Sequence, residues 1–119
     1  MDIEKYRVHC LKKQDVTEGF PFPNLPNTLV FKVKGKMFTA TNVEVFSSIS
    51  IKCNPENIDD LRAKYPAVTK PGYFSDRHWS WVMMDGSIPD NQILKWIDES
   101  YELVIAKLPK TRKMKAKRK

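Results

Sequence analysis

Hydrophobic side chains recur at helical spacing in three stretches of the chain, and each stretch predicts a helix. The first runs from Asp2 to Gln14, the second from Asn54 to about Tyr65, and the third from Pro89 to Leu108. The third is the most regular, because its apolar positions return to one face of the helix. These positions are Ile93, Ile97, Tyr101, Val104 and Leu108. We expect this face to lie across a sheet.

Between the helical stretches, polar and apolar residues alternate, as expected of strands with one buried face. Thr28 to Thr41 predicts a hairpin that turns at Gly35, and Phe46 to Cys53 predicts a third strand. The segment from Asp15 to Asn27 contains three prolines and is predicted to be irregular. This order of elements indicates an α+β fold, a two-layer sandwich in which the helices pack on one face of an antiparallel sheet.

The stretch from His78 to Met84 predicts a further strand, rich in aromatic residues and followed by a turn at Asp85-Gly86. Its alternation places Trp79 and Trp81 on one face and His78 on the other. Either face can be the buried one, so the tryptophans are core residues in one interpretation. In the other interpretation they form an exposed aromatic surface beside basic side chains, which can stack bases or anchor a protein partner.

The net charge of +7 is unevenly distributed along the chain. Residues 107–119 contain eight of the 21 basic side chains and no acidic one, which leaves 21 minus 8, or 13, basic groups against 14 acidic groups on residues 1–106. We therefore expect one near-neutral domain at residues 1–109 and a basic, disordered tail at residues 110–119. Such a tail either binds polyanions without sequence preference or only improves solubility.

No catalytic or metal-binding constellation is visible in the sequence. Cys10 and Cys53 form no Cys-x-x-Cys pair, and zinc normally takes three or four protein ligands, so no metal or cofactor is expected. His78 has no recognisable acid or nucleophile partner, so the protein is not expected to be an enzyme. No apolar run approaches the ~20 residues that cross a bilayer. We expect a cytoplasmic monomer without membrane contact, with both cysteines free and buried.

Several motifs resemble those of the MmcQ/YjbR-like proteins and follow that family's order over about residues 18 to 109. They include Phe20-Pro21-Phe22, Ile51-Lys52-Cys53-Asn54-Pro55-Glu56, Leu61-Arg62, Arg77-His78-Trp79 and Asp85-Gly86-Ser87-Ile88-Pro89-Asp90. The resemblance implies a CyaY/frataxin-like architecture and DNA binding through hairpin wings, a double-wing arrangement, and it brings no catalytic activity. Iron binding, which a frataxin-like fold suggests, is not expected, because few acids lie near the first helix. These are Asp2, Glu4 and Asp15.

The basic residues near the predicted hairpin and its neighbouring strands are our candidates for contact with DNA phosphates, without sequence specificity. They are Lys32, Lys34, Lys36, Lys52 and Arg77, and the tail residues Lys110, Arg112 and Lys113 would add further affinity. The hairpin lysines have a second interpretation, as charged residues that protect an exposed strand edge.

The alternative function is a protein-interaction module with no role in nucleic-acid binding. In that case the partner surface would be centred on His78, Trp79 and Trp81, because aromatic side chains dominate the binding energy of many protein interfaces.

Overall fold

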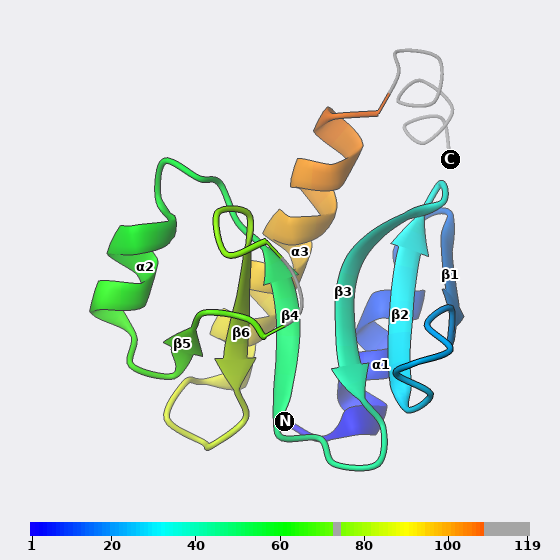
Figure 1. The fold of residues 1–119 in the computed structure, drawn as a ribbon, viewed down its shortest axis with the longest axis horizontal. Coiled ribbons are helices and arrows are strands. Elements are labelled where there is room, and N and C mark those ends of the chain that lie inside the picture. Colours follow the sequence, from blue (N-terminus) through cyan, green and yellow to red (C-terminus); the bar gives the residue numbers. More distant parts are fainter. Residues whose placement is uncertain (73–74, 109–119) are drawn as a thin grey trace.

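A computed structural model describes residues 1–72 and 75–108, and in these residues the chain forms three helices and one six-stranded sheet (Figure 1). The helices are α1 (Ile3–Leu11), α2 (Ile58–Lys64) and α3 (Asp90–Ala106). The strands are β1 (Val16–Gly19), β2 (Thr28–Val33), β3 (Lys36–Asn42), β4 (Ser48–Lys52), β5 (Val68–Thr69) and β6 (Trp79–Met83). The predicted tail at residues 110–119 lies outside the described residues.

Every neighbouring pair of strands in the sheet is antiparallel, in the order β1-β2-β3-β4-β6-β5. Helices α1 and α3 lie behind one face of the sheet, and α2 lies at its β5 end (Figure 1). This arrangement confirms the predicted α+β fold with helices packed on one face of an antiparallel sheet. We call the opposite side of the sheet the open face.

The predicted hairpin is confirmed as β2 and β3, and two residues with left-handed backbone form its turn. Lys34 has a φ of +51° and Gly35 a φ of +83°. Two consecutive residues with positive φ give the turn a twist that matches that of the flanking strands. Glycine adopts this conformation without a steric cost, which is why Gly35 marked the turn in the sequence.

Two short strands were not predicted. Strand β1 lies inside the segment that was predicted to be irregular, and it pairs with β2 along the sheet edge. Strand β5 contains two residues and pairs with β6 at the other edge. Neither strand is long enough for alternation to be visible in the sequence. The predicted first helix was also too long, because α1 ends at Leu11 and the chain then turns at Asp15, whose φ is +65°.

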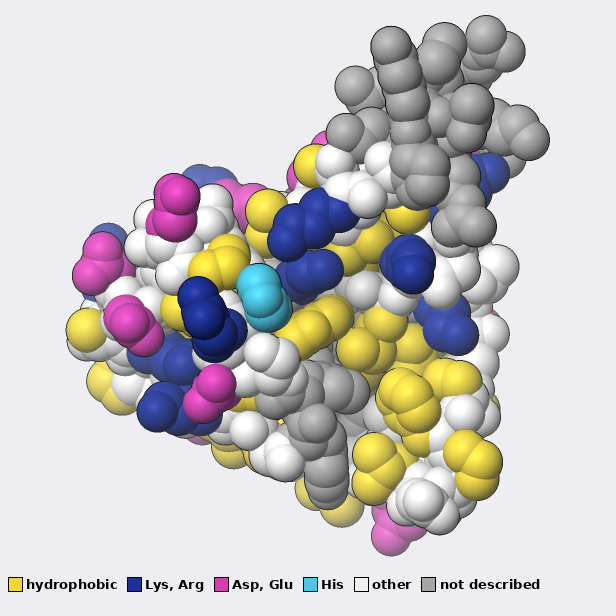
Figure 2. Space-filling view, turned by 45° about the horizontal axis from the view of Figure 1, so that its top comes forward, with side chains coloured by type: hydrophobic (Ala, Val, Ile, Leu, Met, Phe, Trp, Pro, Cys, Tyr) yellow, Lys and Arg dark blue, Asp and Glu magenta, His cyan; other side chains and the backbone are white. Residues whose placement is uncertain are grey.

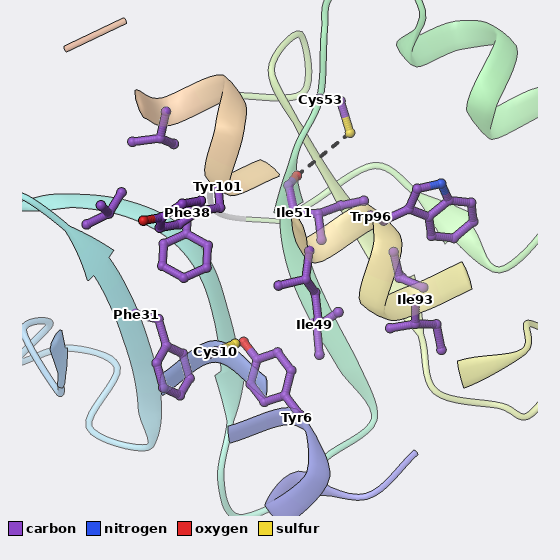
Figure 3. Packing of buried hydrophobic residues seen from close by; sticks show 14 of the residues in the cluster. Tyr6, Cys10, Phe31, Phe38, Ile49, Ile51, Cys53, Ile93, Trp96 and Tyr101 are labelled. Atoms are coloured by element: carbon purple, nitrogen blue, oxygen red, sulfur yellow. Dashed lines mark hydrogen bonds between the residues drawn. The ribbon is translucent and has the colours of Figure 1, made fainter. Parts of the chain in front are cut away.

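The apolar face of α3 packs across the centre of the sheet, as predicted (Figure 3). Tyr101 of α3 meets Phe38 of β3 edge to face, with ring centroids 5.3 Å apart. Tyr6 of α1 meets Phe31 of β2 in the same way at 5.5 Å. The remaining buried residues of α3 are Ile93, Trp96, Ile97, Ser100, Val104 and Ile105. Burial of these apolar surfaces supplies most of the stabilisation of the fold.

Ser100 is the buried polar residue within this face, and it joins β3 to β4. These strands pair at only three positions, the last of which is Thr39 with Ile51. At the next position the Ser100 hydroxyl accepts a hydrogen bond from the Lys52 backbone N–H (2.8 Å) and donates one to the Phe38 carbonyl. The hydroxyl stands where a direct bond between the strands would otherwise form. Beyond this point β3 and β4 diverge (Figure 1).

We expect Ser100→Ala to lower the free energy of unfolding by about 1–3 kcal/mol, because a buried N–H and a buried carbonyl lose their shared partner. Urea unfolding followed by circular dichroism measures this change. Ser47→Ala removes an exposed hydroxyl and should change the same quantity by less than about 0.5 kcal/mol. A Ser100→Ala protein as stable as the parent would contradict a net stabilising role for the bridge.

Candidate nucleic-acid interface

The register of the sheet shows which side chains share the open face. Directly paired residues of antiparallel strands project to the same side. The central row on this face runs across four strands and contains Val30, Ala40, Ser50 and Trp81. Lys52 lies two residues beyond Ser50 on β4 and pairs with Trp79. The face therefore combines small, aromatic and basic side chains.

Three lysines lie at the ends of three elements, near the point where β3 and β4 diverge. Lys36 begins β3, Lys52 ends β4, and Lys107 is the C-cap of α3. Burial lowers the pKa of Lys52 below the ordinary lysine value of 10.5, and the positive charges of Lys107 and Lys36 lower it further. We call these three residues the lysine cluster.

Within the described residues, the lysine cluster forms no salt bridge. Some other cations of the domain have carboxylate partners, as in the bond of 2.6 Å between Arg7 and Glu18. Figure 2 shows Lys and Arg side chains gathered around a histidine and hydrophobic side chains on the face turned toward the viewer. Like charges held together without carboxylates favour the binding of an anion.

The other candidate phosphate contacts lie in different environments. Lys32 is half-buried on β2, and Arg77 is exposed in the loop before β6. Lys34 reaches Asp15, with its Nζ 3.5 Å from Oδ1, so its charge is partly neutralised within the protein. The tail residues Lys110, Arg112 and Lys113 lie outside the described residues.

Arg62 supports this surface, a role that was not predicted from the sequence. Its guanidinium donates hydrogen bonds to the carbonyls of Asp76 and Trp79, both at 2.7 Å, and to the hydroxyl of Ser80 at 3.2 Å. These bonds tie α2 to the start of β6 and hold the backbone on both sides of Arg77. The signal in the sequence was the Leu61-Arg62 pair among the motifs of the resemblance.

The register also shows which face carries the tryptophans. Ser80 and Val82 of β6 are fully buried beneath the helices, so Trp79 and Trp81 project to the open face, where both are half-buried. His78 is half-buried, its carbonyl accepts a hydrogen bond from the Cys53 backbone, and its Nδ1 has no partner in the described part of the chain. The three predicted partner-surface residues are thus neighbours, although His78 alternates away from the tryptophans.

The described residues give little basis for nucleophilic or metal chemistry. Burial raises the pKa of the free thiols of Cys10 and Cys53, which keeps them protonated. Cys53 also donates a hydrogen bond to the Ile51 carbonyl (Figure 3). No group of three or more His, Cys, Asp or Glu side chains in the described ranges could hold a metal ion. The helices of the described residues are too short or too polar for any of them to cross a membrane.

Two hollows were not predicted from the sequence. The larger, of about 1100 Å³, lies between α2 and α3 and is lined by apolar residues such as Leu61 and Trp96 and by charged ones, Lys52 among them. The smaller, of about 340 Å³, lies on the open face and is lined by residues 24–28, 40–42, Ser47, Ser48, Ser50 and Trp81. We call the smaller hollow the Trp81 pocket. His78 lines neither hollow.

Comparison with known proteins finds relatives over almost the whole chain. The sequence model of the YjbR family matches residues 11–103. The uncharacterized protein YjbR of Escherichia coli strain K12 is 34% identical over 114 residues, which cover 95% of each chain.

Solved structures share the fold. A crystal structure of the Deinococcus radiodurans protein DR2400, with a DUF419 domain, superposes with a TM-score of 0.88 at 28% identity and covers 96% of this chain and 86% of its own. A Pseudomonas syringae protein, at 22% identity, superposes with a TM-score of 0.72 over 87% of this chain and 98% of its own. The motifs of the sequence, the family match and the shared fold agree, and the chain belongs to the YjbR family.

Proposed function

We propose that this protein binds DNA without sequence preference, mainly through contacts between its basic side chains and phosphates. The observation that carries the proposal is the lysine cluster, in which the charges of Lys36 and Lys107 act on the half-buried Lys52 and none of the three has a carboxylate partner among the described residues. A phosphate placed among them would offset both their repulsion and the partial burial of Lys52. DNA supplies such phosphates at close intervals.

The surroundings of the cluster support the same proposal. Lys32 and Arg77 lie on elements that flank it, on β2 and before β6. Lys107 is also the first of the eight basic residues near the C-terminus, so the tail follows the cluster closely in the sequence. Residues 1–106 have a net charge of −1, so attraction to DNA would come from this end of the molecule and from the tail.

The first test concerns the convergence of the lysines. We expect the double variant Lys36→Gln, Lys107→Gln to raise the pKa of Lys52 toward the ordinary lysine value, because two of the charges that lower it are gone. The remaining burial should keep the pKa below that value. Titration of the Lys52 side chain by NMR measures the change.

The matched control is Lys12→Gln, Lys95→Gln, which removes two exposed lysines, one that caps the end of α1 and one on α3. It should leave the Lys52 pKa where it is.

The lowered pKa of Lys52 also affects the stability of the fold, because the unfolded chain binds this proton more tightly than the folded one. The contribution of Lys52 is therefore unfavourable below its folded pKa and becomes less so as pH rises through it. An unchanged Lys52 pKa in the double variant would remove the basis of the proposal.

The second test measures DNA binding as a function of salt. We expect the triple variant Lys36→Gln, Lys52→Gln, Lys107→Gln to bind more weakly than the parent and to lose about 0.9 from the slope of log affinity against log salt for each lysine that contacts a phosphate of duplex DNA. Fluorescence anisotropy with a labelled duplex at several salt concentrations gives the slope.

Two further proteins complete this experiment. The triple variant Lys12→Gln, Lys64→Gln, Lys95→Gln has the same net charge but keeps the cluster, and it should retain the parent slope. A chain that ends at Pro109 separates the tail from the domain, and it should still bind DNA with a reduced slope. Binding that disappears entirely with the tail would count against the cluster and would favour a protein partner for the domain.

A further inference from the structure

The Trp81 pocket owes its depth to small side chains at the centre of the sheet. Ala40, Ser48 and Ser50 form its floor, while Trp81 and the loop of residues 24–28 form its walls. The backbone at Gly72 comes close to one edge of the Trp81 ring, because a Cβ atom added there would lie only 3.1 Å from its Cη2 atom. The pocket therefore has one aromatic wall.

The pocket also offers neutral hydrogen-bonding groups. The hydroxyls of Ser48 and Ser50 have no hydrogen-bond partner within the described residues. Ser50 is 6% exposed and lines the pocket, so a ligand there could reach its hydroxyl. Asn24 and Asn42 also line the pocket, and the Asn42 Oδ1 already accepts hydrogen bonds from the backbone N–H groups of Glu44 and Val45. An aromatic wall with hydroxyl and amide groups suits a planar heterocycle that carries donors and acceptors on its edge.

The distance from the pocket to Lys52 is similar to the distance from the base to the phosphate in a nucleotide. Ser50 and Lys52 are two residues apart on one strand, so their Cα atoms are separated by about 7 Å along it. In a nucleotide, a single sugar separates the planar base from its phosphate. A base in the pocket would therefore leave its phosphate within reach of Lys52.

We propose that the Trp81 pocket receives one unpaired base of a single-stranded nucleic acid whose phosphates lie on the lysine cluster. This inference rests on the proposed function for the phosphates and adds the recognition of a base. A base within a duplex is stacked and paired, so it cannot enter a hollow in a sheet surface without leaving the helix. The volume of about 340 Å³ is near the lower limit for ligand pockets, which suits one base. DNA and RNA share this chemistry.

The test compares probes that carry the same number of phosphates. The full chain is titrated with labelled single-stranded DNA, with RNA of the same sequence, and with a DNA strand of the same length in which every nucleotide is abasic. We expect the base-containing strands to bind about tenfold more tightly than the abasic strand, as is typical of a base on an aromatic side chain. The ratio of the two affinities shows whether the protein prefers DNA or RNA.

A pocket-filling variant locates the effect. Ser50→Leu should lower the affinity for base-containing DNA to that of the abasic strand and leave the abasic strand unaffected. Thr17→Leu makes a similar change on the exposed edge strand β1 and should alter neither affinity. Ser48→Leu fills the pocket from a half-exposed position and replaces Ser50→Leu if thermal melting shows that the latter does not fold.

The outcomes separate this inference from the proposed function. Equal affinity of the parent for base-containing and abasic strands overturns the base pocket and leaves the phosphate site standing. A Ser50→Leu or Ser48→Leu protein that folds and still prefers the base-containing strand also overturns it. Failure of every strand to bind the parent at low salt overturns both proposals.

Discussion

The placement of α3 across the joint between β3 and β4 is the constraint on which the rest of this structure depends. The joint is narrow, with three paired positions, and side-chain hydroxyls reinforce it. The Thr39 hydroxyl donates a hydrogen bond to the Ser50 carbonyl, and the Thr41 hydroxyl donates one to the Ser48 carbonyl, each at 2.7 Å. The Ser100 hydroxyl of α3 adds a third link between the two strands. These hydroxyls are buried, so each bond contributes more than it would in water. The apolar face of α3 then holds both sides of the sheet together.

The two features proposed to bind nucleic acid both lie along this joint. The lysine cluster occupies the end where the strands separate, because Ser100 stands between their backbones and Lys107 follows the last turn of the same helix. The Trp81 pocket occupies the paired part, where Ala40 and Ser50 face each other across it. The joint between β3 and β4 therefore places the proposed phosphate site directly beside the proposed base pocket.

Local patterns predicted much of this fold, and contacts between distant residues account for what was missed. The hairpin, β4 and α3 were predicted because their periodicity lies within a few consecutive residues. The bridging role of Ser100 depends on Phe38 and Lys52, which are 62 and 48 residues away. The partial neutralisation of Lys34 by Asp15, and the effect of Lys36 and Lys107 on Lys52, likewise required the folded register. Trp79 and Trp81 were recognised as a pair, but their face followed only from the pairing of β6 with β4.

The order of the elements along the chain has a consequence for biosynthesis. Strands β1, β2 and β3 come from residues 16–42, and β4, β5 and β6 from residues 48–83, so each half of the sheet is continuous in sequence. The helix that covers both halves is made last. Until it leaves the ribosome, apolar side chains such as Phe38 and Ile51 remain without their cover. The domain therefore completes its folding only after its C-terminal helix has been translated.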